Sequence, residues 1–111
     1  MLAMLRTSCL LVLMYFAIGL AQAADFEAKL AIRNHKFEPG ELTVPAGAKI
    51  KLTVENQDAT PEEFESADLN REKVVVGNGT IIVLLGPLDA GKYHFFGDFH
   101  QETAQGELIA K

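Results

Sequence analysis

The stretch GKYHFFGDFH, residues 91–100, decides the fold of this chain. Proline and glycine at positions 86–91 predict a turn just before it. Tyr93 follows that turn and can donate its hydroxyl to upstream backbone, as a tyrosine does at a corner of Greek-key sandwiches. His94 alternates with Tyr93 and Phe95, so we expect its side chain to point away from the core. The stretch therefore predicts a strand of a β-sandwich that runs into a connecting loop.

The rest of the chain has the same strand-like pattern. Apolar residues recur at every second position in residues 26–33 and 50–55, a period typical of a strand. Shorter apolar runs stand between glycine and proline residues further along: 42–44, 74–76, 80–85 and 107–110. Seven or eight short strands with this punctuation predict an all-β fold, a Greek-key β-sandwich. No amphipathic helix is evident, and residues 68–73 fit either a short helical turn or a loop.

The tripeptide Gly77-Asn78-Gly79 separates two of these runs, residues 74–76 and 80–85. Asn-Gly is a strong signal for a tight β-hairpin turn, because both residues tolerate a positive φ. We therefore expect the two runs to pair as neighbouring strands of one hairpin.

Residues 1–23 have the features of a secretory signal peptide. Arg6 gives a short positive start, residues 9–20 form a nearly unbroken apolar run, and AQA at 21–23 is a small-x-small cleavage site. The apolar run is shorter than the ~20 residues that a membrane span needs, so an uncleaved anchor is the less favoured alternative. We expect an exported protein whose working part is one small domain, residues 24–111.

The composition of residues 24–111 argues against several classes of function. The single Cys and all three Met precede residue 24, so this part has no sulfur ligand for a metal and no disulfide. The whole chain carries 15 acidic and 10 basic residues, and an acidic surface argues against nucleic acid and anionic membranes as partners. Hydrolytic chemistry finds no support, because the chain has no Gly-x-Ser-x-Gly motif and no phosphate-binding glycine loop.

Four segments resemble the sequence of a cupredoxin and together span essentially all of residues 24–111: FEP at 37–39, LTVPAG at 42–47, VENQD at 54–58, and PLDAGKY at 87–93 with the residues that follow. A blue-copper centre uses a Cys thiolate, two His imidazoles and a weak axial Met. In the matching positions, Gly97 replaces the Cys and Ala104 lies roughly at the Met. Glu62, or less closely Glu63, replaces one His. Only His100 of that ligand set is retained, so no blue-copper centre is expected.

Three further segments narrow the resemblance: EEFES at 62–66, DLNREK at 68–73 and FGDFH at 96–100. They are similar to the cupredoxin-like periplasmic proteins that accompany bacterial ferrous-iron permeases. The resemblance implies a periplasmic protein that binds iron or copper and assists iron uptake by delivering or oxidising Fe(II). Its partner would be an inner-membrane iron permease or another periplasmic metal-binding protein. Without a blue-copper relay, oxidation would need an external electron acceptor.

The ligand set implied by the resemblance is Glu62, Asp98 and His100, with help from Glu63 or Glu65. On a strand, Glu62 lies on the core side and the other two glutamates lie on the opposite side. A loop histidine with carboxylate neighbours is a reasonable metal ligand. Carboxylate oxygen with imidazole suits a divalent transition metal such as Fe, Mn, Zn or Cu(II) better than Cu(I). Iron or copper is the expected metal.

Other polar residues are expected to be structural or exposed. His35 has no carboxylate within two positions, so we interpret it as a structural or surface residue. Arg71 and Lys73 flank Glu72, a pattern that predicts a strip of surface ion pairs.

Two alternatives to a role in iron uptake stay open from the sequence. One is a metal-free cupredoxin-fold interaction module whose acidic edge docks a partner, and the other is a copper or zinc scavenger. For a metal-binding protein, we expect Glu62 and His100 at the loop end of the sandwich, outside the apolar core. Their substitution would then abolish metal binding and change stability by less than ~0.5 kcal/mol.

Overall fold

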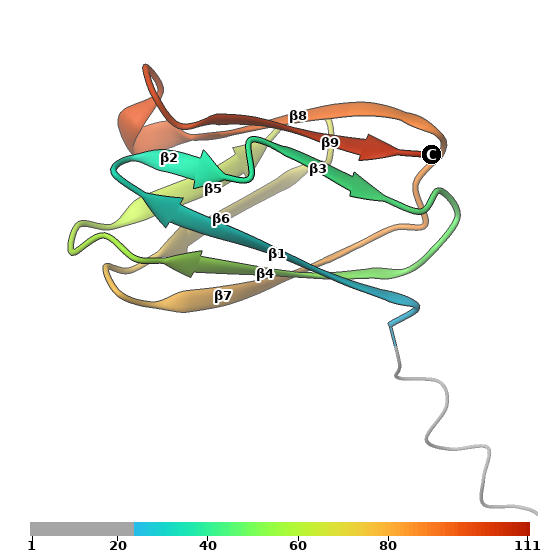
Figure 1. Ribbon diagram of the computed structural model, residues 1–111, viewed down its shortest axis with the longest axis horizontal. Coiled ribbons are helices and arrows are strands. Elements are labelled where there is room, and N and C mark those ends of the chain that lie inside the picture. Colours follow the sequence, from blue (N-terminus) through green and yellow to red (C-terminus); the bar gives the residue numbers. More distant parts are fainter. Residues whose placement is uncertain (1–23) are drawn as a thin grey trace, which may run out of the picture.

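The computed structural model describes residues 24–111, which fold into two β-sheets packed face to face (Figure 1). One sheet has the strand order β2-β1-β4-β7 and the other β3-β9-β8-β5-β6. The strands are β1 Phe26–Arg33, β2 Lys36–Glu38, β3 Glu41–Val44, β4 Ile50–Asn56, β5 Glu62–Ser66, β6 Arg71–Val75, β7 Thr80–Leu85, β8 Gly91–Gly97 and β9 Gln105–Ala110, and the 3-10 turn η2 is Asp98–His100. The expected all-β sandwich is confirmed. It has nine strands within the described residues, rather than seven or eight, because the three-residue β2 was not foreseen.

The described chain enters the sandwich at Asp25, whose backbone N–H donates to the carbonyl of Lys49 at 3.0 Å. The predicted signal peptide, residues 1–23, lies outside the described residues. Among the residues that the structure describes, no helix is long and apolar enough to cross a membrane.

The core lies between the sheets, and the alternation of the strands selects which residues enter it. In β4, Ile50, Leu52 and Val54 are at most 1% exposed, whereas the residues between them are half-buried. β4 is a central strand, parallel to β1 and antiparallel to β7. Full burial of such a side chain contributes roughly 1.5–3 kcal/mol, so these positions anchor the sheet. Other core residues come from both sheets: Leu30, Ile32, Phe37, Val44, Phe64, Leu69, Val75, Val83, Leu85, Phe95, Ala104, Leu108 and Ala110.

Three phenylalanines form the aromatic part of this core. The ring of Phe95 lies 5.0 Å from that of Phe37 and 5.4 Å from that of Phe64. Aromatic pairs at such distances add ~0.5–1.5 kcal/mol each beyond the burial of their area. Each phenylalanine is two residues along the chain from a residue at the loop end of the sandwich, His35, Glu62 or Gly97. The cluster therefore fixes where those three residues emerge.

The expected hairpin at Asn78-Gly79 is wrong. β6 pairs with β5 and β7 pairs with β4, so the turn carries the chain from one sheet to the other. The backbone N–H of Gly79 donates to the carbonyl of Val76 at 2.9 Å, which makes Gly77 and Asn78 the central residues of the turn. Only Asn78 has a positive φ, 59°. A hairpin turn of the Asn-Gly type needs positive φ at both central residues, and other turns splay the strands.

Other turns follow from local chemistry. Asn34 and His35 both have positive φ, 55° and 59°, and join β1 to β2 as a tight hairpin that the sequence pattern did not signal, because His stands in place of Gly. Tyr93 donates its hydroxyl to the carbonyl of Asp89 at 2.8 Å, which confirms the expected corner contact. Residues 67–70 form a turn, and β6 begins directly after it.

Candidate metal centre

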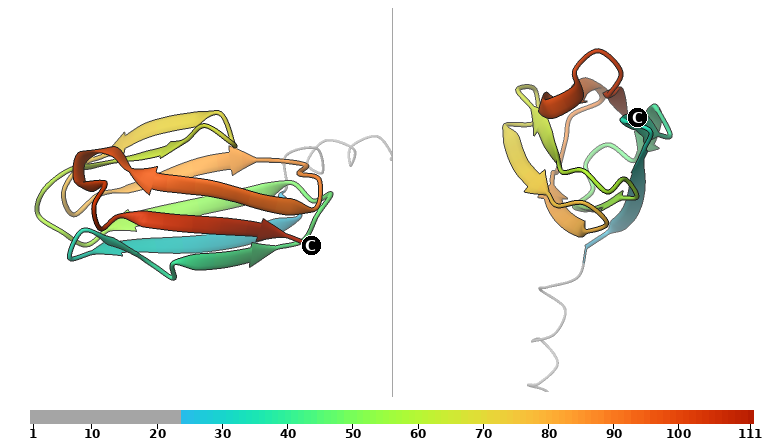
Figure 2. Two further views of the ribbon diagram at one scale, coloured as in Figure 1. Left: turned by 90° about the horizontal axis from the view of Figure 1, so that it is seen from above. Right: turned by 90° about the vertical axis from the view of Figure 1, so that its left-hand side faces the viewer.

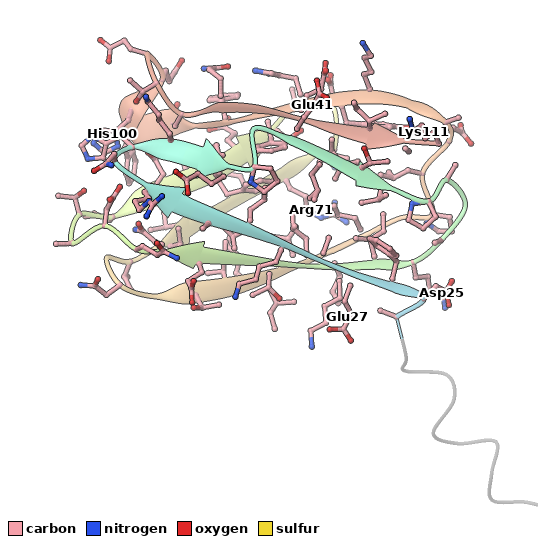
Figure 3. All side chains as sticks on the ribbon, in the orientation of Figure 1. Asp25, Glu27, Glu41, Arg71, His100 and Lys111 are labelled. Carbon is pink, nitrogen blue, oxygen red and sulfur yellow. The ribbon has the colours of Figure 1, made fainter. Side chains whose placement is uncertain are left out.

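Glu62 and His100 meet at one end of the sandwich, where the β1–β2 turn, the β4–β5 loop and η2 gather (Figures 2 and 3). Glu62 begins β5 with its side chain directed inward, and only 1% of it is exposed. Its Oε1 accepts hydrogen bonds from the backbone N–H of Glu63 at 2.9 Å and of Phe99 at 2.8 Å. Its Oε2 lies 2.7 Å from His100 Nδ1. The expected inward direction of Glu62 at the loop end is confirmed, but the expectation of an exposed group outside the core is wrong, because the side chain is buried.

Gly97 provides the space that the Glu62 carboxylate fills. A Cβ atom on Gly97 would lie 2.6 Å from Glu62 Cδ and 2.7 Å from Glu62 Oε2. It would also lie 2.7 Å from the Cβ of Ala104. Cβ atoms essentially never approach other heavy atoms so closely, so a residue larger than glycine does not fit while Glu62 is in place. Packing against Glu62 and Ala104 thus explains why a glycine stands at the position that matches the blue-copper cysteine.

His35 covers the His100 imidazole. The two rings are stacked with centroids 3.6 Å apart and an interplanar angle of 12°. Asp58 holds the turn, because its carboxylate accepts from the backbone N–H groups of Asn34 at 2.8 Å and His35 at 3.0 Å. Thr103 donates its hydroxyl to the carbonyl of His35 at 2.5 Å. Sequence reasoning missed this role of His35, because its partners stand more than 20 residues away.

The surroundings of Asp58 favour its negatively charged form. Partial burial alone would raise the pKa of the Asp58 carboxyl, but the backbone N–H groups of His35 and Asn34 lower it. The positive charges that His35 and His100 can carry lower that pKa further, and the net effect is a pKa below its ordinary value.

A second group of carboxylates lies on the outer face of the β5–β6 pair. Glu63, Glu65 and Glu72 each offer an oxygen, and these atoms all lie within 4.8 Å of one another. We call these three residues the outer carboxylate group. Partial burial and then the charges of Glu72, Glu65 and Asp98 raise the pKa of Glu63 to about 7. Partial burial, Glu72 and Asp98 raise the pKa of Glu65 as well. Repulsion between like charges is the expected state of such a group without a cation.

The structure therefore divides the five predicted ligands into two sets. Glu62 and His100 face the interior, whereas Glu63 and Glu65 face outward. Asp98 acts on the outward pair through its charge, and its side chain accepts a hydrogen bond from Gln101.

Glu72 was not foreseen as a site residue. The expected ion-pair strip is wrong, because Arg71 donates to the carbonyl of Leu84 at 2.9 Å and Lys73 donates to the carbonyl of Ile82 at 3.3 Å. Glu72 lies directly opposite Glu65 in the antiparallel pair. Strand alternation places Glu72 on the face away from Arg71 and Lys73, and this signal could have found it.

With this geometry established, comparison with known proteins assigns the family. The family described as Cupredoxin-like domain matches residues 7–110. The chain belongs to the cupredoxin-like family. An uncharacterised protein of Rickettsia prowazekii (strain Madrid E) is 53% identical over 83 residues, which are 75% of this chain and 66% of that protein. The chain thus spans slightly less than two thirds of that relative.

Blue-copper proteins share the fold of this cupredoxin-like chain. Auracyanin A, a "blue" copper protein from Chloroflexus aurantiacus, superposes with a TM-score of 0.65 at 18% identity, over 77% of this chain and 98% of auracyanin. A Cu(I) form of an amicyanin variant superposes with a TM-score of 0.64 at 23% identity, over 82% of this chain and 88% of amicyanin. At these identities the likeness concerns the fold alone.

The inner end of this cupredoxin-like domain does not fit a blue-copper ion. Such an ion needs a thiolate and a weak axial thioether beside two imidazoles. Residues 24–111 contain no Cys and no Met. The Nδ1 atom of His100 is already bonded to Glu62, and the carboxylate occupies the space beside Gly97. Both the missing sulfur ligands and the filled space therefore argue against a blue-copper ion at this end of the domain.

Proposed function

We propose that this cupredoxin-like domain binds a transition-metal ion through the outer carboxylate group and serves in iron acquisition. The observation that carries the proposal is the convergence of Glu63, Glu65 and Glu72 within 4.8 Å. Partial burial and then like-charge repulsion raise the pKa of Glu63 and Glu65, and a bound cation would relieve the repulsion. Asp98 would add a fourth negative charge beside the ion.

The ligand chemistry favours a hard or intermediate ion. Three carboxylates supply only oxygen, which suits Fe or Mn better than Cu(I). They also leave coordination positions free for water or for a ligand from a partner. A site of this kind on an open sheet face suits an ion that is carried and released. Glu62 and His100 contribute by fixing the start of β5, not by holding the ion.

We place the protein in the periplasm, exported through residues 1–23, with an inner-membrane iron permease or another metal-binding protein as its partner. The resemblance of residues 62–66, 68–73 and 96–100 to proteins that accompany ferrous-iron permeases supports this role. Delivery of Fe(II) needs no redox group. Oxidation to Fe(III) releases one electron, which O₂ or a partner protein would have to accept.

The test is calorimetric titration of the purified protein with Fe(II) under anaerobic conditions, and with Mn(II), Zn(II) and Cu(II). We expect Glu63→Gln, Glu65→Gln and Glu72→Gln each to weaken Fe(II) or Mn(II) binding by roughly tenfold, about 1.4 kcal/mol. The triple variant should show no binding. Glu27→Gln, at an exposed carboxylate on β1, is the matched control and should bind normally.

Unchanged affinity in the triple variant would refute the outer carboxylate group as the site. Binding of Zn(II) or Cu(II) without measurable binding of Fe(II) would instead favour a scavenger.

A specific observation favours the interaction module as a second function. Val76 and Leu84 are each 64% exposed, and Val74 and Ile82 are nearly half exposed. Val74 lies on β6, Val76 follows it directly, and Ile82 and Leu84 lie on β7. A group of exposed aliphatic side chains of this kind is typical of protein contacts. Absence of binding of all four metals, together with capture of a periplasmic partner that the double variant Val76→Ser/Leu84→Ser loses, would support this function.

A further inference from the structure

We propose that the inner end of the domain is closed to metal, because the Glu62 carboxylate fills the space beside Gly97 and itself joins the start of β5 to η2. The inference concerns the interior of the sandwich and does not depend on the outer carboxylate group. It explains why glutamate, glycine and alanine occur together where a blue-copper site has His, Cys and Met.

The space beside Gly97 is already filled. The carboxylate of Glu62 lies where the side chain of residue 97 would begin, 2.6–2.7 Å from an added Cβ. The same Cβ would meet Ala104 at 2.7 Å. Glu62, Gly97 and Ala104 are thus one packing arrangement, in which each residue requires the size of the others. No room is left between them for an ion.

The Glu62 carboxylate links two segments that are far apart in the chain. It joins the start of β5 to η2. Its partners in η2 are Phe99, 37 residues further along the chain, and His100, 38 residues further. A metal ion also holds distant segments together through its ligands. Here three N–H groups converge on one carboxylate instead, from Glu63, Phe99 and His100. Hydrogen bonds to an ionised acceptor are roughly twice as strong as neutral ones.

The Nδ1 atom of His100 is engaged by Glu62. Both backbone N–H groups donate to Oε1, the pattern of an ionised carboxylate, so we infer that Oε2 accepts from the imidazole. Nδ1 of His100 must then carry a proton and cannot offer a lone pair to an ion. A metal at this place would have to displace Nδ1 from Glu62. That would break the hydrogen bond that joins η2 to the buried carboxylate.

The stacked ring of His35 completes the closure. It covers the His100 imidazole at a centroid distance of 3.6 Å. Asp58 and Thr103 hold the backbone of His35 at this place. The β1–β2 turn thus lies against η2 through the stacked rings and the Thr103 hydrogen bond.

Nitrogen-15 NMR of the histidine rings tests the proposal on the unmodified protein. With Zn(II) alone as the probe, Nδ1 of His100 should keep its proton and its chemical shift up to saturating metal. Binding of Zn(II) on the outer carboxylates leaves this result unchanged, whereas coordination of Zn(II) at Nε2 of His100 would contradict closure. Loss of the Nδ1 proton with a metal-type shift of Nδ1 would overturn the proposal.

Absence of Zn(II) binding anywhere would leave the Nδ1 signal unchanged and support closure, while the calorimetric titration alone decides the outer site. The failure of one proposal is therefore distinguishable from the failure of the other.

A stability comparison tests the packing argument. Gly97→Ala should lower the midpoint of thermal unfolding by roughly 10 °C or more, because the new Cβ meets the carboxylate. Gly40→Ala is the matched control, since a Cβ there has no atom within 4 Å, and it should leave the midpoint nearly unchanged. In a Glu62→Ala/Ala104→Gly background, which removes both contacts of the new Cβ, Gly97→Ala should cost less than half as much. Equal losses in the two backgrounds would overturn the proposal.

Discussion

At the scale of single residues, Glu62 and Glu63 show how adjacent side chains of one type acquire opposite roles. Strand alternation turns Glu62 inward and Glu63 outward. Glu62 is buried and receives three N–H groups, one of them from Glu63 itself. Glu63 faces like charges from Glu72, Glu65 and Asp98. The first carboxylate stabilises the fold, whereas the like charges around the second oppose it.

Removal of the inner carboxylate should therefore be costly. We expect Glu62→Ala to lower the free energy of unfolding by about 2–4 kcal/mol, because buried N–H groups and His100 lose their acceptor. Urea denaturation measures this loss. Glu27→Ala, at an exposed position on β1, should change stability by less than ~0.5 kcal/mol. A similarly small change for Glu62→Ala would mean that Glu62 does not hold η2.

The outward carboxylate gives a pH dependence of opposite sign. The pKa of Glu63 is raised from 4.5 to about 7 in the folded state. A raised folded pKa contributes stability that is present below about 4.5 and is lost as the pH rises to about 7. Glu63→Gln should therefore melt at a higher temperature than the unmodified protein at pH 8, with little difference at pH 4. Equal melting temperatures at pH 8 would contradict the repulsion.

Metal binding should depend on pH, because it displaces the proton of Glu63. A cation at the outer carboxylate group competes with the proton of Glu63, whose pKa is about 7. We expect the apparent affinity for Mn(II) to rise with pH up to about 7 and then to level off. Below pH 7 it should fall by roughly tenfold per pH unit for one displaced proton. Calorimetry at several pH values measures this, and an affinity independent of pH between 5 and 8 would contradict it.

At the scale of elements, β6 and β7 are edge strands of different sheets that lie next to each other. Arg71 and Lys73 of β6 donate to the carbonyls of Leu84 and Ile82 on β7. The exposed side chain of Arg71, labelled in Figure 3, thus bridges the edges of the two sheets. Unpaired edge carbonyls next to exposed aliphatic side chains promote strand addition by another chain, and cationic side chains prevent it.

Loss of these two cations should cause self-association. We expect Arg71→Ala/Lys73→Ala to form dimers or larger species at concentrations where the unmodified protein does not, because β7 then offers free carbonyls beside Leu84. Sedimentation velocity measures the change. Lys29→Ala, at an exposed lysine on β1, is the control and should not alter the association state. Unchanged sedimentation of the double variant would show that the edge is protected in another way.

At the scale of the whole molecule, the apolar core and the outer carboxylate group are separate parts of one sandwich. Leu52 on the central strand β4 is fully buried, whereas the carboxylates lie on the outer face of the other sheet. We expect Leu52→Ala to lower the free energy of unfolding by about 2–5 kcal/mol. Metal affinity measured well below the melting temperature should not change. A parallel loss of affinity would show that core packing and the metal site are coupled.

The sequence by itself determined the sheet-forming pattern, the absence of sulfur from residues 24–111 and the inward direction of Glu62. All three depend on composition or on a period of two along one strand, which local chemistry dictates. The Tyr93 corner contact belongs with them, because its partner Asp89 is four residues away.

Only the tertiary structure decided which residues meet. His35 reaches His100, Glu72 reaches Glu63 and Glu65, and the turn at Asn78 changes sheets instead of closing a hairpin. These outcomes depend on strand order and register, which are set by the packing of the whole core. The same applies to Gly97, whose missing side chain has meaning only because Glu62, 35 positions earlier in the chain, fills its place.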